Sequence, residues 1–143
     1  MKHISLILLL AAVFSTATTA TAKKVVVPKM YVFGIAASFN DTIVHFTNIQ
    51  EVDSAWIDKK TNFLVGRDSY SYQMRDYMEQ NHQMPHRTCI VFYNKERAKL
   101  EKKYLKMKRL YMPGKDGKAH FDLRYLNSSD FKFKAYDASE DEK

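Results

Sequence analysis

The chain contains 143 residues, of which 45% are hydrophobic and 27% are charged. These values predict one globular domain and exclude a disordered chain, a collagen-like chain and a protein with several membrane-spanning helices. The formal net charge is +7, and the single cysteine, Cys89, excludes both an internal disulfide framework and a structural zinc site built from cysteines.

Residues 1–22 have the pattern of a secretory signal peptide. Lys2 and His3 form a positive start, an apolar stretch follows over 4–14, and Ala20-Thr21-Ala22 form a small-x-small cleavage site. The apolar stretch is shorter than the ~20 residues that cross a bilayer. We therefore expect an exported protein, periplasmic or secreted, with an uncleaved N-terminal anchor as the alternative. No cysteine lies near the cleavage site, which excludes a lipoprotein anchor.

The chain after residue 22 begins with residues typical of strands. Residues 23–28 form a lead-in, and residues 31–39 then alternate between large apolar and small side chains. This alternation predicts a strand with a helix packed closely on its small face. The turn-forming pair Asn40-Asp41 joins it to a second predicted strand over 42–47, as in a tight hairpin.

A short helical turn is predicted next, because Ile49, Val52 and Trp56 recur at spacings of three and four. Residues 63–65 form a short apolar run that predicts at most a brief extra strand. A longer helix is predicted from Asp68 or Ser69, either of which can cap it, to about His82. Its apolar stripe consists of Tyr70, Met74, Tyr77 and Met78.

The second half of the chain predicts a strand over 88–93 and a second helix over 95–111. Residues 120–125 alternate and predict a strand with one wet face. Residues 131–134 predict a last edge strand. The remaining residues, 137–143, form a polar tail that we expect to be disordered.

This order of elements predicts an α+β fold with a single domain over 23–136. Its mixed β-sheet of four to five strands carries two amphipathic helices packed on it. Residues 88–93 form an apolar run that predicts a central strand, so Cys89 within it is expected to be buried and inert, with a thiol available to another chain as the alternative.

The positive charge is concentrated in one predicted helix. Residues 95–109 hold eight basic and two acidic residues, whereas the rest of the chain after residue 22 is neutral. At 100° per residue, one side of this helix carries an apolar stripe of Leu100, Tyr104, Met107 and Tyr111. The opposite side carries five cations, Lys95, Lys99, Lys102, Lys106 and Arg109.

These five cations form the candidate partner-binding site. The simplest interpretation is a solvated surface, and the functional one is a docking face for an acidic protein, an anionic glycan or a lipid headgroup. A third interpretation is self-association, because residues 30–58 carry four acids and no Lys or Arg. Nucleic acid is not expected, because Tyr104 and Tyr111 face the core instead of forming a stacking platform.

An enzyme is the alternative function, a small hydrolase with a site of dispersed residues such as His45, Asp53 or His120. The sequence assigns no catalytic residue, cofactor or metal ligand. His82 and His86 have a metal-binding spacing, but Pro85 interrupts a helix through both. His86 and Cys89 fall on opposite faces of an extended strand, which argues against a nucleophilic dyad.

Four stretches resemble segments of small secreted proteins of Bacteroides-type bacteria. These stretches are Ser38-Phe39-Asn40-Asp41-Thr42 with Ile49-Gln50-Glu51-Val52-Asp53-Ser54-Ala55-Trp56, then Tyr70-Ser71-Tyr72-Gln73-Met74-Arg75-Asp76-Tyr77, and Arg87-Thr88-Cys89. The resemblance implies an envelope or secreted location and transfers no activity, fold or site. The concentration of the net charge in residues 95–109 leads us to expect a non-enzymatic binding module, with the enzyme and a self-associating envelope component as alternatives.

Overall fold

A computed structural model of the chain describes residues 23–142, so the predicted signal peptide lies outside the described residues. The described chain forms a mixed sheet of five strands and two helices, a single small α+β domain as predicted. The elements are β1 (Lys24–Ala37), β2 (Ile43–Thr47), β3 (Gln50–Asp58), α1 (Arg67–His82), β4 (Thr88–Asn94), α2 (Arg97–Tyr111), β5 (Asp122–Leu126) and a short 3₁₀ turn, η1 (Ser139–Glu142).

Strand β1 is the centre of the sheet. Strand β4 pairs with β1 along one side. Strands β2 and β3 pair one after the other along its other side, and all three strands are antiparallel to β1. Ile35 lies opposite Phe46 and Val32 opposite Gln50, so one extra residue is accommodated where β2 passes into β3. Strand β5 pairs in parallel with β2 and forms the far edge. Strand β4 pairs with β1 alone and lies at the opposite edge, so the prediction of a central strand over 88–93 is wrong.

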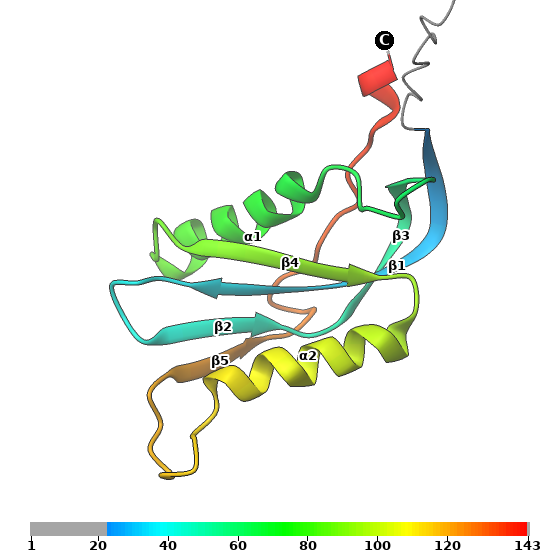
Figure 1. The fold of residues 1–143 in the computed structure, drawn as a ribbon. Coiled ribbons are helices and arrows are strands. Elements are labelled where there is room, and N and C mark those ends of the chain that lie inside the picture. Colours follow the sequence, from blue (N-terminus) through cyan, green and yellow to red (C-terminus); the bar gives the residue numbers. More distant parts are fainter. Residues whose placement is uncertain (1–22, 143) are drawn as a thin grey trace, which may run out of the picture.

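The two helices cover opposite faces of the sheet (Figure 1), because β1 is apolar on both of its faces. Val32 and Ala36 belong to the core beneath α1, whereas Phe33 and Ile35 belong to the core beneath α2. The small-residue face of β1 does receive a helix, as predicted. A Cβ atom built on Gly34 would lie 2.7 Å from Met74 Sδ of α1.

Helix α1 buries the predicted apolar stripe. Tyr70, Met74 and Met78 are fully buried, and Tyr77 packs against the same core. The predicted cap is wrong. Gly66 precedes the helix in the left-handed conformation, with φ of 71°, and no side chain caps the first turn. The chain needs glycine here because a Cβ atom would overlap the ring of Tyr136.

The first two strands extend differently from the prediction. Strand β1 begins at Lys24, so the expected lead-in is part of the sheet, and it ends at Ala37, which leaves Phe39 fully exposed in the turn. The turn is also longer than an Asn40-Asp41 pair, because β2 starts only at Ile43. The carboxylate of Asp41 stabilises this turn by accepting a hydrogen bond from the Ile43 amide at 2.9 Å.

The predicted helical turn after residue 49 is wrong, because this segment is β3. Ser54 has a left-handed φ of 58° and lies opposite Pro28, which has no N–H to donate to the ladder. The distortion changes which side chains of the strand face the core. Val52 and Ala55 therefore both point into the core although they are three residues apart, a spacing that resembles a helix. Residues 63–65 contribute a single bridge, between Leu64 and Ile57.

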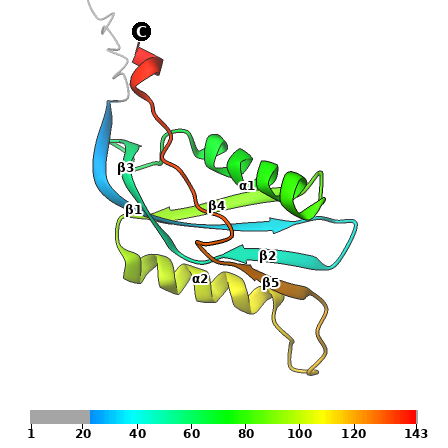
Figure 2. The same ribbon diagram turned by 180° about the vertical axis from the view of Figure 1, so that it is seen from behind.

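The segment after β5 crosses the sheet on the α1 side and returns to the start of β1 (Figure 2). The edge strand predicted over 131–134 is absent from the described residues, although Phe131 and Phe133 are both buried. The Gln50 amide holds them instead, donating to the Phe131 carbonyl at 2.8 Å and accepting from the Phe133 amide at 2.9 Å.

The polar tail is ordered as far as residue 142, contrary to the prediction. Ala138 is fully buried, and η1 follows it. The carboxylate of Asp141 pairs with Lys24 at 3.3 Å and accepts a hydrogen bond from the Tyr136 hydroxyl. The end of the described chain is thereby attached to the beginning of β1.

Candidate functional site

Helix α2 is held on the sheet by aromatic contacts that fix which of its sides faces water. Leu100 is 2% exposed, and Tyr104 packs edge-on against both Phe33 and Phe46, with ring centroids 5.1 and 5.7 Å apart. Tyr111 makes a similar contact with Phe46 at 5.7 Å. The predicted apolar stripe of this helix is therefore confirmed.

All five predicted binding residues are exposed. We call this set, Lys95, Lys99, Lys102, Lys106 and Arg109, the basic face. The helix begins at Arg97, two residues later than predicted, so Lys95 lies in the turn before it.

Within the basic face, the cations differ in whether they have a partner. Lys99 forms an ion pair with Glu96 at 2.6 Å. No ion pair to a described residue involves Lys102, Lys106 or Arg109. These three positive charges are thus exposed on a firmly packed helix without a neutralising carboxylate among the side chains that the structure describes.

The other cations of α2 are engaged within the domain. Arg97 pairs with Glu101 at 3.1 Å and lies 5.7 Å from the centre of the Tyr31 ring. Lys108 lies 5.0 Å from the Tyr125 ring centre, and its hydrogen bond with Tyr125 raises the pKa of the ammonium. Their side chains extend over the sheet.

A groove between β4 and the two helices extends the basic surface. Its cavity of about 360 Å³ is lined by residues of all three elements, including Arg67, Tyr93, Asn94, Lys99 and Lys103. Arg67 lies 6.0 Å from the Tyr93 ring centre, and Lys103 lies 5.3 Å from the Phe92 ring centre. Sequence reasoning missed this groove, because its residues come from segments far apart in the chain.

An apolar cavity of about 380 Å³ lies at the other end of β4, beside the C-terminal end of α2. Ile90, Phe121 and Phe39 contribute exposed surface to it, and Tyr111 packs on Phe121 with a centroid distance of 5.1 Å. Strand β4 therefore runs from an apolar groove at Thr88 to a basic groove at Asn94.

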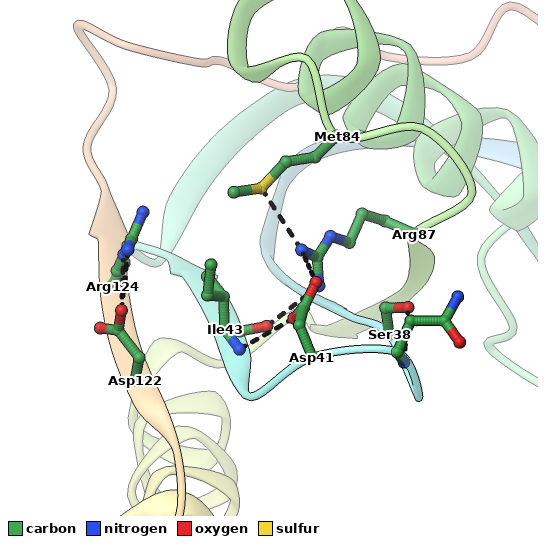
Figure 3. Close-up of polar contacts among 8 residues, drawn as sticks. Ser38, Asp41, Ile43, Met84, Arg87, Asp122 and Arg124 are labelled. Carbon is green, nitrogen blue, oxygen red and sulfur yellow. Dashed lines mark hydrogen bonds and ion pairs between the residues drawn. The ribbon is translucent and has the colours of Figure 1, made fainter.

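Two ion pairs lie on the side of the sheet where the loop after α1 meets the turn between β1 and β2 (Figure 3). The Arg87 guanidinium donates to both carboxylate oxygens of Asp41, at 2.8 and 2.5 Å, and to the Ile43 carbonyl. Asp122 and Arg124 form a second pair on β5, at 2.8 Å. The guanidiniums lower the pKa of both carboxyl groups, mainly through these hydrogen bonds.

His45 is buried on the α1 side of β2. It is 2% exposed, its Nδ1 has no hydrogen-bond partner among the described residues, and its ring lies 5.3 Å from that of His82. Burial, reinforced by the positive charge that His82 can carry, lowers the pKa of His45 to about 4. The imidazole is therefore neutral at physiological pH.

The residues of the alternative enzyme site are not brought together. His45 lies opposite Ala36 and Asp53 opposite Lys29, seven positions apart along β1, or roughly 23 Å at ~3.3 Å per residue. His120 lies in the loop before β5 and faces Asp116 at 3.7 Å.

Neither Cys89 nor any metal-ligand candidate belongs to the basic face. Cys89 is a half-buried free thiol, and burial raises its pKa to about 11. Within residues 23–142, no group of three His, Cys, Asp or Glu residues is placed to hold a metal ion. Over the same residues, the structure contains no helix with the length and apolar character that a membrane span requires.

Comparisons of the chain with family models, with curated proteins and with solved structures gave no match.

Proposed function

We propose that this protein is an exported, non-enzymatic binding module that engages an acidic protein through the basic face of α2. The proposal rests on one observation, the three adjacent exposed cations Lys102, Lys106 and Arg109, which have no carboxylate partner among the described residues. A surface with unneutralised charge attracts a ligand of opposite charge and speeds its association.

The packing of α2 supports the proposal. Tyr104 and Leu100 fix the rotation of the helix, so the cations keep a constant arrangement without a partner. A preorganised face loses less conformational freedom on binding than a mobile one. Leu105 and Leu110, exposed on the same helix, add apolar surface, which favours a protein over a ligand that offers charge alone.

Export is the second part of the proposal. Its support is the pattern of residues 1–22 and the resemblance to small secreted bacterial proteins. In the cell envelope, an anionic glycan or a lipid headgroup is the competing kind of ligand. The experiment below includes probes of all three kinds.

The test uses three probes and two variants that have the same net charge. The charge-reversed variant is Lys102→Glu/Lys106→Glu/Arg109→Glu. The control, Lys59→Glu/Lys60→Glu/Lys132→Glu, changes three exposed lysines that lie outside α2. Each protein, produced from the full chain, is titrated with poly-glutamate, with heparin and with vesicles containing anionic lipid.

We expect poly-glutamate to bind the wild type and the control, with an affinity at least about tenfold lower for the charge-reversed variant. Circular dichroism should be unchanged in both variants, since all six positions face water. Equal loss in the two variants would refute the proposal, because net charge alone would then explain binding. Binding to heparin or vesicles but not to poly-glutamate would replace the acidic protein by that ligand.

A further inference from the structure

Strand β4 has an open edge. Over its seven residues it pairs with β1 alone, and no backbone hydrogen bond joins its outer side to another described segment. An exposed edge presents unpaired N–H and C=O groups that can pair with a further strand.

The edge lacks the features that normally prevent such pairing. Native edge strands are protected by charged residues, proline or bulges. The sequence of β4, TCIVFYN, contains no charged residue, proline or glycine, and its register with β1 is unbroken from Thr88 to Asn94. Ile90 is 44% exposed on this strand.

Cations from both helices border this uncharged edge. On the α1 side, Arg67 lies over the Tyr93 ring, and the positive charge of Arg75 acts on the Cys89 thiol. On the α2 side, Lys103 lies over the Phe92 ring, and Lys99 lines the same groove. Lys99 also forms the ion pair with Glu96. A strand added here would therefore have positive charge above and below it.

We propose that the outer edge of β4 accepts an extended, acidic segment of a partner protein as an additional strand of the sheet. The inference rests on the proposed function and specifies how the acidic partner is held. Backbone hydrogen bonds to β4 supply the pairing, and the bordering cations select acidic side chains. The apolar groove beside Ile90 and Phe121 selects an apolar side chain at the other end of the segment.

A second copy of this chain fits the edge less well than an acidic segment. Pairing of β4 with β4 of another molecule would bring Arg67, Lys99 and Lys103 of both copies onto the same two faces. The like charges would repel each other, most strongly at low ionic strength. Charge complementarity therefore favours an acidic partner.

The test compares two seven-residue peptides of alternating Glu and Val, as long as β4. One has an ordinary backbone, and in the other every backbone nitrogen is methylated, which keeps the side chains and charges but removes the hydrogen-bond donors. Each is titrated into the wild type, into Arg67→Glu/Lys103→Glu, which reverses the two exposed cations lying over rings of β4, and into Lys102→Glu/Lys106→Glu/Arg109→Glu. Arg67→Glu/Lys103→Glu should weaken binding of the ordinary peptide. Amide hydrogen exchange is measured over 88–94 with and without peptide.

We expect the ordinary peptide to bind and to slow exchange within β4, and the methylated peptide to bind at least about tenfold more weakly. Equal binding of the two peptides, with exchange in β4 unchanged and affinity still lost in the charge-reversed variant, would overturn strand addition and leave the proposed function intact. Binding of neither peptide while poly-glutamate still binds would overturn strand addition alone, and absence of poly-glutamate binding as well would overturn both. A concentration-dependent dimer that protects β4 without peptide would assign the edge to a second copy.

Discussion

The guanidinium of Arg87 and the carboxylate of Asp41 form a two-pronged ion pair, with N–O distances of 2.8 and 2.5 Å. The pair joins the loop after α1 to the turn between β1 and β2. The Arg87 side chain is 4% exposed, whereas that of Asp41 is 38% exposed. The buried cation therefore depends on a carboxylate that is accessible from solvent.

The first prediction concerns this pair. Asp41→Asn should lower the midpoint of denaturant unfolding, because it leaves the buried guanidinium without its counter-charge. Arg87→Met in the Asp41→Asn background should restore part of the loss. Denaturant unfolding of the single and double variants measures both effects. Additive losses in the double variant would show that the two side chains are not coupled.

The second prediction concerns acid stability. The pKa of His45 falls from 6.5 to about 4 on folding, so the unfolded chain binds more protons between these values. The stabilising contribution is complete above about pH 6.5 and is lost as the pH falls through 4, amounting to up to about 3 kcal/mol. The charged groups that act on His45 are His82, Arg87, Arg124 and Asp122. The variant that tests the prediction retains all four.

That variant is His45→Phe, which should flatten the dependence of unfolding free energy on pH between 6.5 and 4. His86→Phe, the same substitution at an exposed histidine, is the matched control. Denaturant titrations across this pH range provide the measurement. A slope that persists in His45→Phe would mean that another group titrates.

The third prediction concerns Gly66, which begins α1. Gly66→Ala should lower the free energy of unfolding by about 1–3 kcal/mol, because alanine disfavours a φ of 71° and its Cβ would overlap the Tyr136 ring. Gly117 has nearly the same φ, 69°, and open space around it. Gly117→Ala therefore measures the conformational part alone, and equal losses in the two variants would exclude the contact with Tyr136 as a cause.

The fourth prediction concerns the Cys89 thiol. Burial raises its pKa to about 11, so little thiolate forms at neutral pH, and the folded protein should react with iodoacetamide far more slowly than the unfolded protein. Mass spectrometry after timed labelling measures the two rates. Comparable rates in the folded and unfolded protein would show that the thiol is accessible and ionised.

The helices could be predicted from the sequence because each has one apolar side. The stripes beginning at Tyr70 and Leu100 repeat at helical spacing, and both are confirmed. Strand β3 could not be predicted, because the left-handed conformation of Ser54 interrupts the alternation of its side chains. Val52 and Ala55 are therefore both buried at a spacing that is typical of a helix. Such a distortion depends on the neighbouring strand, which a local pattern does not contain.

The basic face could likewise be predicted, since its charges lie within one segment. The groove along β4 could not, because Arg67 precedes Tyr93 by a helix and a loop, and only the paired sheet places them together. The pattern of β4 itself led to the wrong prediction of a central strand. The run TCIVFYN contains no charge, proline or glycine, which is unusual for a strand at the edge of a sheet.

The most direct test of the central claim is the ratio of poly-glutamate dissociation constants for the two variants of equal net charge. A Lys102→Glu/Lys106→Glu/Arg109→Glu variant that binds at least about tenfold more weakly than Lys59→Glu/Lys60→Glu/Lys132→Glu would show that recognition resides on α2. A ratio near unity would contradict the account, because the arrangement of charge on the helix would then have no role in binding.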